Sequence, residues 1–314
     1  MFNLFRKKEY KLSKCYERYF DDVEANMRLA RSSIAKYKEV ALKVIAIIGD
    51  IDVRDIDESS ITNLKREMNA KELSSQRKNH LLVTLKNVLG YLINQEKLKV
   101  LEPSKITKFR VSQKEVEYLA KKELIQLASA PNPNTITGSR NQAIIEAFIS
   151  TGCRVAELTS INRNQMNFET GIMSIRTKGD KPHQIIFNKS SLDAIKRYLD
   201  KRTDDCEALF ATTHTDSPKR LQINDIQRSL RNLGRKLGFS INVTPHCLRR
   251  SSATLMFKEG VPLGVIQKFL NHSSSQVTTR FYLGNLDFED LKKNHERVMN
   301  FDFDKKEVKG GDDA

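Results

Sequence analysis

The sequence has 314 residues, 39% of them hydrophobic, which suits two compact domains that each bury a core. Its formal net charge of +15 exceeds what solubility requires and favours an anionic partner, most commonly nucleic acid. The four cysteines lack CxxC spacing, which argues against a structural zinc site and a disulfide framework, and no apolar run approaches the roughly 20 residues that span a bilayer. We therefore expect a cytoplasmic chain without a membrane partner.

The first hundred residues are predicted to be helical. Residues 1–11 are basic and lack the apolar centre of a signal peptide, so we interpret them as an arm, with an interfacial role left open. Apolar residues at three- and four-residue spacing then predict an all-helical binding domain over residues 12–100. Its four helices are expected at about 12–28, 34–49, 60–68 and 75–97.

Basic side chains of this region are candidates for contacts with a DNA backbone, although a solvated helix face explains those near the last long helix equally well. Residues 101–112 have mixed charge, a proline and no periodicity, so we interpret them as an interdomain linker that could also cross a phosphate backbone. The candidates are Lys71, Arg77, Lys78 and Lys86 near the helix, and Lys105, Lys108 and Arg110 in the linker.

A second domain is expected over residues 113–300, followed by a polar tail over 301–314. Its helices are expected at about 113–130, 140–150, 190–201 and 223–237, with another ending near Met299. The stretch 171–187 alternates apolar and polar residues on both sides of Lys-Gly-Asp-Lys, which predicts a hairpin with Lys178 near its tip. The predicted fold is mainly α: an all-helical first domain and an α+β second domain with a small antiparallel sheet.

Several side chains of the second domain could carry phosphoryl chemistry. Arg154 begins a predicted helix, and Glu157, three residues later, could orient its guanidinium or form an ordinary ion pair. His246 and Arg249 have the same spacing behind a Thr-Pro helix start, so both face one side of that helix. An arginine fork suits a phosphate, and a nearby His could accept a proton from a nucleophilic Tyr282. For each residue taken alone, a cap, turn or core role is the better interpretation.

Taken in order, these residues resemble the tyrosine recombinases, the family of phage integrases and Xer-type recombinases. The sequence departs from the family pattern at three positions, with Asn271 and Thr177 where a glycine is usual and Arg250 where a histidine is frequent. The family's catalytic set falls on Arg154 in TGCRVAEL, Lys178 in TKGDK, His246 and Arg249 in HCLR, His272 in LNHSS and Tyr282 in TTRFY.

The resemblance implies a reaction in which Tyr282 attacks the scissile phosphate, giving a 3′-phosphotyrosyl bond and a free 5′-hydroxyl. It implies that Arg154, Arg249 and His272 hold the non-bridging oxygens, that His246 assists proton transfer and that Lys178 protonates the leaving oxygen. Because the covalent link stores the bond energy, no metal or cofactor is implied. The helical domain over 12–100 would be the core-binding domain that clamps DNA.

The implied partner is double-stranded DNA with inverted-repeat half-sites, on which four protomers exchange strands through a Holliday junction, with accessory DNA-binding proteins as further candidates. Integration or excision of a mobile element, chromosome dimer resolution and inversion all stay open as the role, with action in the nucleoid. An apolar series after Tyr282 would pack on a neighbouring protomer or fold back on its own domain. Two other interpretations stay open: a type IB topoisomerase-like nicking-closing enzyme and a non-catalytic DNA-binding protein of recombinase descent.

Overall fold

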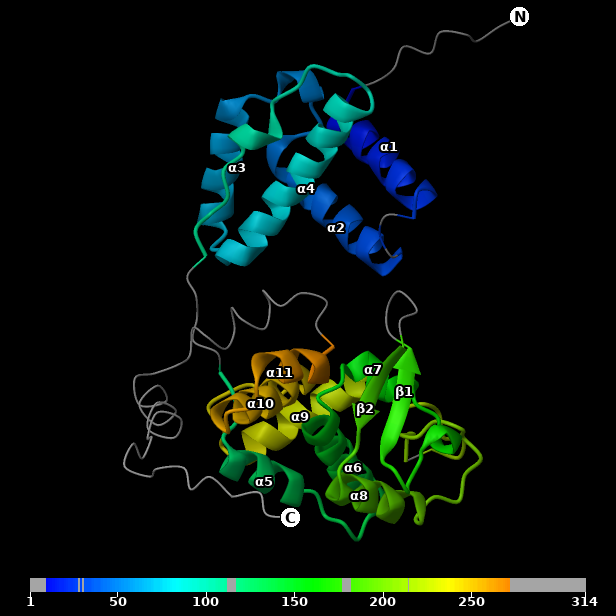
Figure 1. The fold of residues 1–314 in the computed structure, drawn as a ribbon. Coiled ribbons are helices and arrows are strands. Elements are labelled where there is room, and N and C mark those ends of the chain that lie inside the picture. The colour runs from blue at the N-terminus through cyan, green and yellow to red at the C-terminus, as the bar shows by residue number, and fades with distance from the viewer. Residues whose placement is uncertain are drawn as a thin grey trace, which may run out of the picture. The chain divides into compact units, whose positions relative to one another are not determined.

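The computed structural model describes residues 10–27, 29, 31–111, 117–176, 182–213 and 215–271. The chain divides into two compact units, Met1–Lys114 and Glu115–Ala314 (Figure 1). The predicted fold class is confirmed, because the described part is mainly helical and contains one small antiparallel sheet. No helix in these described ranges is long and apolar enough to cross a membrane. Most of the expected arm, the polar tail and the helix near Met299 lie outside them.

The first unit contains the four predicted helices. Leu82, Leu85 and Leu89 have no exposed surface and form the buried stripe of the last long helix. The third helix begins two residues earlier than predicted because the Asp57 carboxylate accepts a hydrogen bond from the backbone N–H of Ser60 at 2.8 Å and so caps it. The elements are α1 (Leu12–Ala25), α2 (Arg31–Ile48), η1 (Val53–Asp55), α3 (Glu58–Ala70), α4 (Ser75–Asn94) and η2 (Pro103–Lys105).

Residues 101–110, expected to be an interdomain linker, pack against this unit instead. Ile106 is buried in its core, and Phe109 packs against the same cluster. The Asn79 amide makes two hydrogen bonds to the backbone of Phe109, donating to its carbonyl at 2.9 Å and accepting from its N–H at 2.7 Å. The Lys86 ammonium donates to the Ile106 carbonyl at 3.1 Å. Two apolar residues are too few for a periodic pattern, so the sequence did not indicate this attachment.

In the second unit, α6 lies at the centre and packs against α8 and α10 (Figure 1). Phe148 of α6 and Tyr198 of α8 are among the largest fully buried side chains. The elements are α5 (Lys121–Ser129), α6 (Ile136–Thr151), α7 (Val155–Ser160), η3 (Arg163–Gln165), β1 (Ile172–Arg176), β2 (Pro182–Ile186), α8 (Lys189–Leu199), α9 (Ile223–Lys236), α10 (Pro245–Lys258) and α11 (Leu263–Phe269).

Two helices of this unit differ from their predicted bounds. α5 begins at Lys121 and not near residue 113, because the Glu123 carboxylate accepts from the backbone N–H of Ala120 at 2.7 Å and caps the helix there. α6 begins at Ile136 because the Thr135 hydroxyl accepts from the Gly138 N–H at 3.0 Å.

The hairpin is two-stranded and antiparallel. Ile175 pairs with His183, and Ser174 pairs with Gln184. Because side chains alternate along a strand, Ile175 and His183 share the buried face, whereas Ser174 and Gln184 are exposed. The sheet thus carries one imidazole at a position otherwise suited to an apolar core residue.

Candidate active site

The helix α10 supplies two of the predicted residues. The Thr244 hydroxyl accepts from the backbone N–H of Cys247 at 3.1 Å, and Pro245 occupies the first turn, so the helix begins at the predicted point. His246 follows and is exposed, while Arg249, one turn further along, is only 6% exposed. Burial of a guanidinium is costly unless its N–H groups find acceptors.

The N–H groups of the Arg249 guanidinium find acceptors in backbone carbonyls. Its Nη1 donates to the carbonyl of Gly152 at 2.6 Å, and its Nη2 donates to the carbonyl of Leu270. Gly152 ends α6 with φ at 56°, a left-handed conformation that favours glycine. A Cβ at this position would lie 2.4 Å from the Phe269 ring, so the close packing of α6 on α11 also needs glycine. Gly152 therefore both ends α6 and provides a carbonyl for Arg249.

Arg154 lies directly before α7 and is held from two sides. Its Nη1 donates to Glu157 Oε1 at 2.8 Å, while its backbone N–H donates to Glu157 Oε2 at 2.6 Å. Its Nη2 donates to the carbonyl of Asn271 at 3.2 Å. The Arg154 side chain is 46% exposed and that of Glu157 only 7%, so the guanidinium reaches outward from a buried support.

The Asn271 carbonyl depends on an uncommon backbone conformation. Asn271 has φ at 46°, in the left-handed region that glycine enters freely and asparagine tolerates better than most residues. This residue stands where the resemblance leads us to expect glycine. Asparagine and glycine both suit this conformation. Asparagine in place of the usual glycine therefore preserves the turn that directs the carbonyl to Arg154.

Arg154, His246 and Arg249 line one open hollow of about 530 Å³, together with Gln227 and Arg231 of α9. Desolvation by the surrounding protein lowers the pKa of His246, and the positive charges of Arg250 and Arg249 lower that pKa further. The imidazole is therefore neutral at neutral pH and can accept a proton. Within the residues that the structure describes, no three His, Cys, Asp or Glu side chains gather as a metal site.

Sequence reasoning missed His183, on the buried face of β2. It is 9% exposed, and its Nε2 has no hydrogen-bond partner among the described residues. Burial lowers its pKa; Glu157 opposes this effect, and the charges of Arg249 and Arg154 add to it. The imidazole thus shares the electrostatic surroundings of both arginines. Its one sequence signal is a polar side chain among inward-facing apolar positions.

Three predicted site residues, Lys178, His272 and Tyr282, lie outside the described residues. Lys178 belongs to the stretch between β1 and β2, and His272 follows Asn271 directly in the sequence. The described site therefore comprises Arg154, Glu157, His246 and Arg249 of the predicted set.

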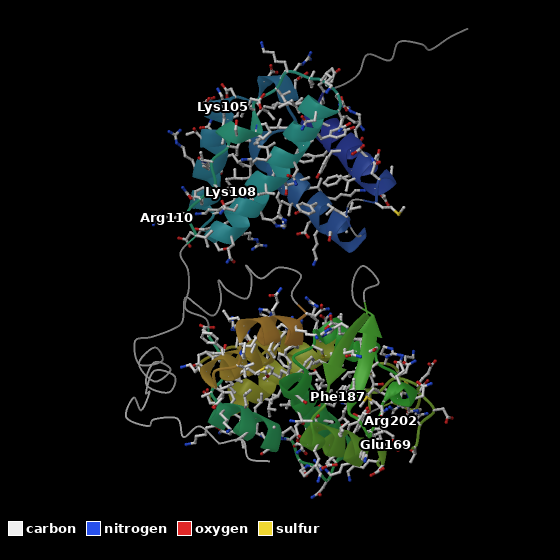
Figure 2. All side chains as sticks on the ribbon, viewed as in Figure 1. Lys105, Lys108, Arg110, Glu169, Phe187 and Arg202 are labelled. Atoms are coloured by element: carbon white, nitrogen blue, oxygen red, sulfur yellow. The ribbon has the colours of Figure 1, made fainter. Side chains whose placement is uncertain are left out.

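The predicted DNA-backbone candidates of the first unit differ in their surroundings. Figure 2 shows Lys105, Lys108 and Arg110 following one another along this unit. Lys105 pairs with Glu58 at 2.9 Å, and the Lys78 ammonium donates to Asn69 Oδ1 at 2.7 Å. Like Lys86, these two lysines already serve contacts within the unit. Lys71, Arg77, Lys108 and Arg110 are exposed, as is the paired Lys105.

Residues 117–288, more than half of the chain, match the Phage integrase family. The chain belongs to this family. The tyrosine recombinase XerA of Pyrococcus furiosus is 38% identical over 140 residues, which cover 44% of this chain and 48% of that protein. The tyrosine recombinase XerC of Chlamydia muridarum is 31% identical over 166 residues, which cover 51% and 52% respectively. The chain spans about half the length of these curated relatives.

Solved structures of the same fold extend over nearly the whole chain. A Tn1549 transposon integrase in complex with circular intermediate DNA has a TM-score of 0.74 at 15% identity, and the match covers 92% of this chain and 100% of that one. A XerA recombinase has a TM-score of 0.51 at 23% identity, covering 90% and 97%. At these identities the likeness shows the fold alone, and the matched region extends over both units.

The left-handed turn at Asn271 generates a prediction. We expect Asn271→Gly to leave the free energy of unfolding within about 0.5 kcal/mol of wild type, whereas Asn271→Val lowers it by about 1–3 kcal/mol, since a β-branched residue is strained at positive φ. Urea denaturation monitored by circular dichroism measures both. Equal stability of the two variants would show that the turn does not constrain this residue.

The positive surroundings of His246 generate a second prediction. We expect its imidazole to titrate below the ordinary pKa of 6.5, and Arg250→Gln to raise this pKa without restoring 6.5, because desolvation persists. NMR of ring-labelled histidine across a pH series gives the midpoint. A wild-type midpoint at or above 6.5, or no change in the variant, contradicts the electrostatic account.

Proposed function

We propose that the chain is a tyrosine site-specific recombinase, which cleaves and rejoins DNA through a 3′-phosphotyrosyl intermediate. One observation carries the proposal: Arg154 and Arg249, remote in the sequence, line one hollow with His246. Two guanidiniums that converge on one open space suit a single phosphodiester, because each offers forked donors to the non-bridging oxygens. Membership of the phage integrase family and relatives named tyrosine recombinases support the same reaction.

In the proposed reaction, the Tyr282 oxygen attacks phosphorus while the bond from phosphorus to the 5′-oxygen breaks. Neutral His246 assists removal of the phenolic proton, and Lys178 donates a proton to the leaving 5′-oxygen. Arg154, Arg249 and His272 stabilise the negative charge that develops on the non-bridging oxygens. Glu157 acts through Arg154, because its carboxylate fixes the guanidinium from behind.

Attack by a 5′-hydroxyl from another duplex reverses the first step and joins the exchanged strands. We propose that four protomers perform this exchange twice through a Holliday junction on inverted-repeat half-sites. The helical first unit would clamp the duplex, with exposed Lys71, Arg77, Lys108 and Arg110 as contacts to its backbone. Neighbours solved with DNA, including a lambda integrase dimer bound to a core site, support a DNA partner.

The proposed biological role is integration or excision of a mobile element, or chromosome dimer resolution, in the nucleoid. The two roles differ in the DNA that the protein joins. Sequencing the DNA that becomes covalently attached to the protein would therefore distinguish them, and would also provide the cognate site for strand-exchange assays.

The nucleophile assignment makes the next prediction. We expect wild-type protein to form a covalent adduct with DNA fragments, and Tyr282→Phe to form none while binding DNA normally, because only the attacking oxygen is lost. Denaturing gels detect the adduct, and mobility-shift assays measure the binding. Tyr118→Phe, which removes a phenolic oxygen elsewhere in the same unit, is the control and should retain the adduct.

These assays, together with DNA-relaxation and strand-exchange assays, separate the rival functions. An adduct that persists in Tyr282→Phe would contradict the assignment of Tyr282 as the nucleophile. Relaxation of supercoiled DNA without exchange between cognate sites would indicate a topoisomerase-like enzyme. Binding without any adduct in the wild-type protein would indicate a non-catalytic DNA-binding protein.

A further inference from the structure

A second hollow, of about 760 Å³, lies between the hairpin and α11. Ser174 and Gln184, which face each other across the two strands, line one side, and Gln267 and Lys268 of α11 line the other. Asn271 also lines it, and the same residue's carbonyl accepts from Arg154. The hollow is therefore adjacent to the arginine pair.

The lining chemistry of this hollow suits an anion. Hydroxyl, amide and ammonium groups supply hydrogen-bond donors, and Lys268 supplies a positive charge. None of the lining residues in the described part of the chain is acidic. An anion that entered would meet no repelling carboxylate on these walls.

His183 supplies an independent observation that points to a ligand. It lines this hollow, is more than nine-tenths buried, and has an Nε2 atom without a hydrogen-bond partner among the described residues. A buried polar atom without a partner destabilises the folded state, so an apolar side chain would serve the core better. Because Nε2 is also closed to solvent, we expect the ring to turn toward a ligand that enters the hollow and to gain its partner there.

We propose that the hollow is a second phosphodiester subsite, which receives the DNA phosphate next to the one held by Arg154 and Arg249. Consecutive phosphates of one strand are about 3.4 Å apart along the duplex axis, so neighbouring phosphates suit neighbouring subsites. Lys268 contributes the charge, and Ser174 and Gln184 contribute neutral hydrogen bonds. His183 Nε2 contributes a donor once the ring turns toward the hollow. The inference rests on the proposed function for the DNA strand, but it concerns binding and not cleavage.

A pair of substitutions at Gly264 tests the subsite. Gly264 lines the hollow, and a Cβ there would have no neighbour within 4 Å, so longer side chains fit without steric conflict. We expect Gly264→Glu to weaken binding of a fluorescein-labelled duplex oligonucleotide by at least about tenfold at low salt, because a carboxylate would face the phosphate. Gly264→Gln, of equal size and neutral, should bind near the wild-type affinity. Equal affinities of these two variants overturn the proposal.

The charge of Lys268 provides a second measurement. The slope of log Kobs against log salt should fall in magnitude by about 0.9 in Lys268→Gln, which is the loss of one phosphate contact. Lys201→Gln, an exposed lysine just past α8 that does not line the hollow, should keep the wild-type slope. A wild-type slope in Lys268→Gln contradicts the subsite.

His183→Phe separates binding from folding. We expect the thermal midpoint to stay equal or rise, because the unpartnered buried atom is removed, while DNA affinity falls roughly five- to tenfold. Unchanged affinity in a folded His183→Phe protein shows that His183 only fills the core and overturns its assignment. None of these assays measures cleavage, so they give an answer even if the tyrosine chemistry proves absent.

Discussion

Two consecutive carbonyl groups at the end of α11, those of Leu270 and Asn271, hold the two guanidiniums of the site. The rest of the site depends on this contact, because it ties the first arginine, before α7, to the second, within α10. The left-handed conformation of Asn271 turns the chain after Leu270, so one short segment serves both arginines. Gly152 contributes the other carbonyl that accepts from Arg249, and its lack of a Cβ lets the Phe269 ring pack closely against it.

The choice of acceptor explains how the arginines can serve an anion. A carboxylate beside each guanidinium would neutralise it, whereas carbonyls satisfy its N–H groups and leave the full positive charge. The carboxylate partner of Arg154, Glu157, lies on its buried side. The remaining charge also acts on His246 by lowering its pKa, so the same cations that we propose to hold a phosphate keep the adjacent imidazole able to accept a proton.

Much of the fold could be predicted from the sequence, because its signals are local. The Thr-Pro start of α10, the alternation of the hairpin and the helical spacing of α4 each depend on neighbouring residues. The carbonyl partners of the arginines could not be predicted, since any residue carries a carbonyl and the contacts join distant segments. His183 and the attachment of Phe109 to Asn79 were missed for the same reason: each depends on tertiary packing that leaves no periodic pattern.

The central claim is that Arg154 and Arg249 act as one unit on one phosphate. A double-mutant cycle of single-turnover cleavage with Arg154→Ala, Arg249→Ala and the double variant tests it most directly. Each single substitution should raise the barrier by about 3 kcal/mol or more, as for loss of an oxyanion donor, and the double variant should cost far less than the sum. Additive losses would contradict the claim, because they would mean that the two guanidiniums stabilise the reaction independently.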